Sequence, residues 1–111
     1  RYTCLNSSSY NSILAFKDLV ISPVNHTVSL HNQELVLSKK EFDVLLFMAQ
    51  NAGTILTKKE IYEHVWKQKY LYDAESIMAV MSRLRKKIQA SPSDYQYIQT
   101  VKGIGYRFIA P

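Results

Sequence analysis

The chain has 111 residues, 47% of them hydrophobic and 21% charged, so it can bury one modest core and is too short for two ordinary domains. Its formal net charge of +5 favours an acidic partner, either nucleic acid or an anionic membrane surface. No apolar run approaches the roughly 20 residues of a membrane span, and the single cysteine, Cys4, excludes an internal disulfide and fits a reducing cytoplasm.

The N-terminal stretch RYTCLNSSSYNS is polar and rich in Ser and Asn. We interpret residues 1–12 as a linker or tail from an upstream domain, and residues 13–111 as the folded domain. Short runs of β-branched and apolar residues then alternate with turn-forming residues, which predicts a small antiparallel meander. The stranded region extends from Ile13 to Leu37, with the runs ILAF, LVIS, HTVSL and ELVLS.

Two capping boxes predict where the first two helices begin. Ser38 and Glu41 have the spacing at which a side-chain hydroxyl and a carboxylate each satisfy a free backbone N–H, and an apolar stripe follows as far as a stop at Gly53. Thr57 and Glu60 repeat this spacing and open a second, shorter helix. The connection KQKYLYD comes after it.

A third helix is expected from an N-cap at Asp73 to about Ala90. On a helical wheel one side of it is apolar and predicts a buried stripe, formed by Ile77, Met81, Leu84 and Ile88. The opposite side carries small residues and cations, namely Glu75, Ser76, Ala79, Ser82, Arg83 and Lys86, with Arg85 and Lys87 on the flanks.

Such a basic face is often only solvated, but its context favours DNA. A helix, a connection and a second amphipathic helix with a basic outer face form a helix-turn-helix-like pair. Two extended runs joined by KGIG then predict a hairpin, with Lys102 at its tip and Arg107 one strand onward. A hairpin in this position can contact the adjacent minor groove or backbone.

Three segments, in this order and spacing, resemble the winged-helix effector domain of OmpR/PhoB-type response regulators: LSKKEFDVLLFMAQNAGTILTKKEIYEHVW, SRLRKKI and YIQTVKGIGYRF. The resemblance extends from about Ile13 to Phe108. It implies an α+β winged helix-turn-helix with an N-terminal four-stranded antiparallel sheet, three helices and a C-terminal β-hairpin wing.

The resemblance also implies residue roles. The third helix is the recognition helix, the 67–73 connection can touch RNA polymerase, and Lys102 approaches the minor groove. Trp66 and Thr100 match positions that contact the phosphate backbone. Of the basic pair, Arg83 points outward and is the better candidate for DNA, whereas Arg85 can instead pair with an acidic neighbour.

The recognition helix departs from the family pattern at positions near the bases. It has Ala74 and Glu75 early in the helix, and Val80 where relatives commonly have His. Glu75 can accept from a cytosine amino group, or it is a first-turn acid that the helix dipole favours; Val80 or Ala79 can meet a thymine methyl. The target sequence therefore does not transfer from the family.

We therefore predict sequence-specific binding of double-stranded DNA by a cytoplasmic response-regulator output domain that controls transcription. An upstream receiver domain is expected, with dimers on tandem half-sites and a monomeric isolated fragment. The predicted DNA contacts are Trp66, Glu75, Ser76, Ala79, Val80, Ser82, Arg83, Arg85, Lys86, Lys87, Thr100, Lys102 and Arg107.

Two alternatives stay open: a protein-interaction module that docks an acidic partner, and a DNA-binding domain of a regulator that phosphorylation does not control. The three histidines have no metal-ligand spacing with one another or with Cys4, and no nucleophile–base set or paired carboxylates are suggested. We expect no cofactor, no metal and no enzymatic activity.

Overall fold

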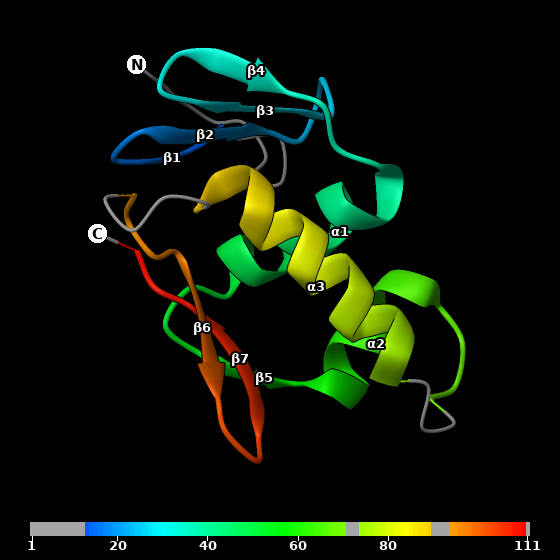
Figure 1. Cartoon of the computed structure of the whole chain (residues 1–111). Coiled ribbons are helices and arrows are strands. Elements are labelled where there is room, and N and C mark those ends of the chain that lie inside the picture. The colour runs from blue at the N-terminus through cyan, green and yellow to red at the C-terminus, as the bar shows by residue number, and fades with distance from the viewer. Residues whose placement is uncertain (1–12, 71–73, 90–93, 111) are drawn as a thin grey trace, which may run out of the picture. The chain divides into compact units, whose positions relative to one another are not determined.

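The computed structural model describes residues 13–70, 74–89 and 94–110, which belong to two compact units divided between residues 36 and 37 (Figure 1). The predicted tail at residues 1–12 and the predicted N-cap Asp73 lie outside the described residues. Each unit is described separately below.

The N-terminal unit is the predicted meander. It consists of β1 (Leu14–Phe16), β2 (Leu19–Ser22), β3 (Thr27–Leu30) and β4 (Gln33–Leu35), antiparallel and in the order β1-β2-β3-β4. Leu19 and Ile21 are buried while Val20 between them is less so, as the two-residue period of a strand requires. The predicted stranded region extended to Leu37, but β4 ends at Leu35; Ser38 caps the next helix, as predicted.

The second unit contains all three predicted helices, α1 (Lys39–Gln50), α2 (Lys58–Trp66) and α3 (Ala74–Ile88). Both predicted capping boxes are present. The Ser38 hydroxyl accepts from the Glu41 N–H at 3.2 Å, and the Thr57 hydroxyl accepts from the Glu60 N–H at 3.0 Å. In each box the glutamate carboxylate accepts the N–H of its capping residue in return.

The predicted hairpin forms from β6 (Ile98–Val101) and β7 (Gly105–Phe108), and a strand that was not predicted joins it. This strand, β5 (Ile55–Thr57), pairs with β7, so the sheet has three strands in the order β5-β7-β6 (Figure 1). The predicted hairpin is thus confirmed, and β5 extends it by one strand. β7 is the central strand, held on both sides.

Gly105 explains how β5 and β7 approach each other. A Cβ atom at this position would lie 2.0 Å from the Leu56 carbonyl oxygen and 2.8 Å from the Thr57 Cα. Glycine is thus required for a close contact between strands, whereas Gly103, with φ of +79°, is required by the turn. The GIG motif therefore combines two different requirements.

The core of this unit is formed by side chains from the three helices and the three-stranded sheet. Leu45 and Met48 of α1, Ile61 of α2, Leu84 of α3 and Phe108 of β7 are all 0% exposed. This core fixes α3 against the other two helices and leaves its remaining sides for other contacts.

Candidate nucleic-acid interface

The described side chains of α3 divide into a buried stripe, an outer face and two flanks. The predicted stripe of Ile77, Met81, Leu84 and Ile88 is confirmed, with each side chain at most 2% exposed. The outer face is solvent-exposed and consists of Glu75, Ala79, Ser82 and Lys86. Two small residues at its centre allow the helix backbone to approach another molecule closely.

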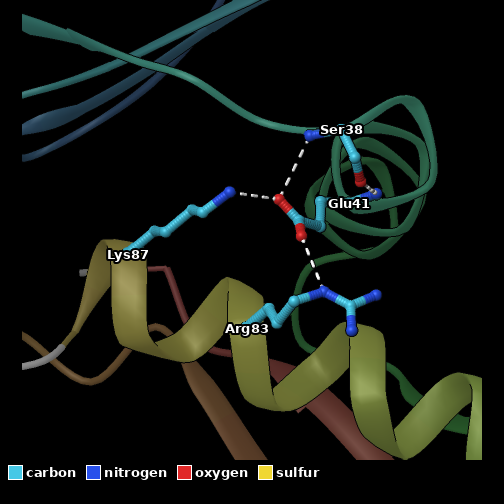
Figure 2. Close-up of polar contacts among 4 residues, drawn as sticks. All are labelled: Ser38, Glu41, Arg83 and Lys87. Atoms are coloured by element: carbon cyan, nitrogen blue, oxygen red, sulfur yellow. Dashed lines mark hydrogen bonds and ion pairs between the residues drawn. The ribbon is translucent and has the colours of Figure 1, made fainter.

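On one flank, two cations of α3 contact a single carboxylate at the start of α1 (Figure 2). Lys87 Nζ donates to Glu41 Oε1 at 2.6 Å, and Arg83 Nε donates to Glu41 Oε2 at 3.1 Å. The Ser38 N–H also donates to Oε1, at 3.1 Å. The Glu41 side chain is 3% exposed, while those of Arg83 and Lys87 remain 56% and 36% exposed.

These contacts keep the buried carboxylate charged. Burial raises the pKa of Glu41, but hydrogen bonds from Lys87, Ser38 and Arg83 together outweigh burial and hold the pKa below its ordinary value. The two cations exceed the single anion by one positive charge. In Figure 2 the terminal nitrogens of Arg83 point away from Glu41, so they are still able to bind an anion.

The other flank of α3 is joined to β6 through Arg85. Its Nη2 donates to the Thr100 hydroxyl at 2.6 Å and to the Ile98 carbonyl at 3.4 Å. Its guanidinium carbon lies 5.6 Å from the centre of the Tyr106 ring. Burial raises the pKa of this tyrosine although the charge of Arg85 opposes the change. Arg85 therefore links α3 to the hairpin.

A groove of about 700 Å³ separates the outer face of α3 from the hairpin. Three cations line it: Lys58 at the start of α2, and Arg85 and Lys86 on α3. Met78 of α3 and Ile104 of the hairpin add exposed apolar surface. No acidic residue of the described chain lines the groove, so its charge is complementary to a polyanion.

At the hairpin tip, residues 102–104 form a three-residue loop in which the Ile104 N–H donates to the Val101 carbonyl at 2.9 Å. Lys102 is exposed in this loop, as predicted. Arg107 lies one strand onward, in β7, as predicted. It pairs across the strands with Gln99, whose side-chain oxygen accepts from Arg107 Nε at 3.1 Å.

Because side chains alternate along a strand, Arg107 points to the sheet face opposite Tyr106, which lines the groove. Arg107 therefore does not line the groove, and its action from the wing together with Lys102 stays a prediction.

Comparison with known proteins agrees with this arrangement. Residues 32–108 match the family described as transcriptional regulatory protein, C terminal. The chain belongs to this family. Together with the relatives below, this match confirms the predicted resemblance to OmpR/PhoB-type response regulators and the predicted winged-helix fold.

Several relatives of this C-terminal domain are informative. The chain is 36% identical over 91 residues to the regulatory protein VanRc of Enterococcus gallinarum, covering 81% of this chain and 39% of the relative. It is 36% identical to the response regulator DrrB, an OmpR/PhoB homologue of Thermotoga maritima, with a TM-score of 0.78 over 88% of this chain and 44% of that one.

The Klebsiella pneumoniae RstA DNA-binding domain, solved in complex with the RstA box, is 32% identical with a TM-score of 0.79. The match covers 87% of this chain and 96% of that one. The chain spans about two fifths of the length of the curated relatives it matches.

Two predicted roles on α3 need correction. Val80 is 4% exposed, so its side chain is part of the core and cannot meet a thymine methyl. The acidic partner also belongs to the other member of the basic pair: Arg83 pairs with Glu41 while remaining 56% exposed, whereas Arg85 bonds to Thr100 and the Ile98 carbonyl. The wheel placed Arg83 outward but could not show that Glu41 lies within its reach.

Trp66 lies at the end of α2 and is not among the groove residues. Its ring stacks on Tyr62 with 4.9 Å between centroids, and Lys40 Nζ lies 5.3 Å from the ring centre. Both contacts are within the domain. The proposed phosphate contact of Trp66 is compatible with its partial exposure but is separate from the groove.

Sequence reasoning missed four residues that shape this interface: Glu41, Lys58, Met78 and Ile104. The capping box already accounted for a glutamate at position 41, so nothing in the sequence indicated that Glu41 also contacts α3. For Met78 the sequence did contain an indication, because on the helical wheel this apolar residue lies outside the buried stripe. Lys58 and Ile104 become significant only when the groove brings them together.

Across the described ranges, no group of His, Cys, Asp and Glu could hold a metal ion. Within the same ranges, no helix is long and apolar enough to cross a membrane.

Proposed function

We propose that this chain binds double-stranded DNA sequence-specifically, as the output domain of a bacterial two-component response regulator that controls transcription, with α3 in the major groove. The supporting observation is the outer face of α3, small at its centre, flanked by cations on both sides and bordered by a groove without acidic residues. The family described above provides independent support.

In this proposal the outer residues Glu75, Ala79, Ser82 and Lys86 face the base edges, with Ser76 beside them. Phosphates on one side of the helix contact Arg83 and Lys87, which hold Glu41 and are 56% and 36% exposed. On the other side Arg85 and Thr100, already hydrogen-bonded to each other, form one phosphate site. Lys102 extends from the hairpin tip to the minor groove, and Trp66 donates its indole N–H to a phosphate.

We propose further partners for the longer protein: an upstream receiver domain, a second copy on tandem half-sites, and RNA polymerase through the 67–73 connection. Residues 67–69 of that connection are exposed, and Tyr70 is fixed by its N–H, which donates to Glu63 at 3.0 Å. Residues 71–73 lie outside the described part. A cytoplasmic protein without catalytic activity or cofactor fits these roles.

The test is selection of duplexes from a random pool, followed by fluorescence anisotropy at two salt concentrations. We expect the selection to enrich one motif. Affinity for it should fall steeply as salt rises, because Lys and Arg side chains that bind phosphates release counterions from DNA. Lys86→Ala and Lys102→Ala should each weaken binding and reduce the salt slope by about 1. No enriched motif would contradict the proposal.

Lys39→Ala is the matched control. This lysine is also exposed but is ion-paired with Asp43 on α1 at 3.0 Å and does not line the groove. Its substitution should leave affinity and salt slope unchanged. If all three variants bind duplex alike, the basic surface would instead be assigned to an acidic protein partner.

A further inference from the structure

Met78 is an exception to the pattern of α3. Among the described residues of this helix it is the large hydrophobic side chain that stays in solvent, 51% exposed, whereas Ile77, Val80 and Met81 around it are at most 4% exposed. An isolated exposed methionine has many explanations, so its surroundings decide its significance.

Those surroundings are the DNA-facing groove. Met78 lines it one turn before Ser82 and two turns before Lys86, next to the outer face of α3. Ile104, which is 53% exposed, lines the groove from the hairpin side. Lys58 and Arg85 are cations in the same lining, and the described lining contains no acid. This charge is unfavourable for a basic partner and favours a polyanion.

We infer that Met78 is a specificity-determining residue that contacts the C5-methyl group of a thymine in the major groove. The inference rests on the proposed function, DNA binding through α3. Among base edges in the major groove, the thymine methyl is the apolar feature. Methionine suits it because its side chain is long, unbranched and polarizable.

The inference replaces the methyl contact predicted for Val80. Val80 is buried, while Met78, two residues earlier, is exposed on the groove side of α3. Ala79 between them is exposed but has one methyl group and little reach. A thymine contact by this helix therefore falls mainly to Met78.

The test uses the selected duplex and replaces each major-groove thymine by deoxyuridine, which removes the methyl group and keeps the hydrogen-bond pattern. For the wild-type protein, at least one replacement should weaken binding about fourfold, the factor for one buried methyl group. For Met78→Ala, the same replacement should have no effect. Met78→Leu should retain most of the wild-type discrimination.

Ile55→Ala is the control, because Ile55 is an exposed apolar residue of β5 that does not line the groove. It should discriminate thymine from deoxyuridine as the wild type does. Equal discrimination by wild type and Met78→Ala, or none by the wild type, would overturn the inference.

If the proposed function itself fails, the result is different: the wild-type protein then binds none of the selected duplexes.

Discussion

Glu41 acts in two structural elements at once. Its carboxylate closes the capping box of α1 and accepts hydrogen bonds from two cations of α3. The capping box uses only the hydrogen bond that the Glu41 carboxylate accepts from the Ser38 N–H. The remaining lone pairs of the carboxylate accept from α3, whereas on a surface glutamate they would accept from water. One residue thus fixes both the beginning of α1 and the position of α3.

We predict that Glu41→Gln lowers the free energy of unfolding by about 2 kcal/mol, because a buried charged acceptor with three donors is replaced by a neutral amide. Urea unfolding at neutral pH measures it. Asp43→Asn is the matched control, because it removes an exposed ion pair with Lys39 on the same helix. That change should cost less than about 0.5 kcal/mol; equal costs for the two variants would contradict a special role for Glu41.

The same residue predicts a dependence of stability on pH. The pKa of Glu41 is lowered in the folded state, so its contribution is present above the ordinary value of 4.5 and is lost as pH falls through the folded pKa. Wild-type stability should therefore decrease on acidification below that value. In Glu41→Gln this part of the decrease should be missing, which urea unfolding across the acidic range would show.

At the scale of elements, local signals predicted the helices and long-range contacts escaped prediction. The capping boxes are three residues apart and the buried stripe of α3 repeats every three or four, so both can be read from adjacent sequence. By contrast, Lys87 and Glu41 are 46 residues apart in the sequence. Strand β5 has only three residues, and its partner β7 lies much later in the chain. No local pattern contains that information.

The three-stranded sheet depends on Gly105. We predict that Gly105→Ala lowers stability by about 3 kcal/mol, because the new Cβ overlaps the Leu56 carbonyl and forces β5 away from β7. Gly53→Ala is the control: nothing lies within 4 Å of its Cβ position, but its φ of +88° strains an L-residue, so about 1 kcal/mol is expected. Urea unfolding compares the two. A smaller loss for Gly105→Ala than for Gly53→Ala would refute the steric explanation.

For the molecule as a whole, net charge gave a class of partner but no location. The value of +5 fits any acidic surface. Folding assigns the cations to distinct tasks: Arg83 and Lys87 hold Glu41, Arg85 joins α3 to β6, and Lys58 and Lys86 line the groove. The sequence could place the cations of α3 on a helix face, but not Lys58, whose role depends on where α2 begins relative to the hairpin.

Lys58 and the adjacent Lys59 provide a whole-molecule test of this assignment, because both are cations in the first turn of α2. Lys58 lines the groove and Lys59 does not. A substitution to Ala at either position changes net charge equally, so a partner that responds only to total charge would not distinguish them. If DNA occupies the groove, Lys58→Ala should reduce the slope of log affinity against log salt by about 1, with little change for Lys59→Ala. Anisotropy titrations over a salt series measure both slopes. Equal slopes for the two variants would mean that DNA is held by the general positive field and not by this groove.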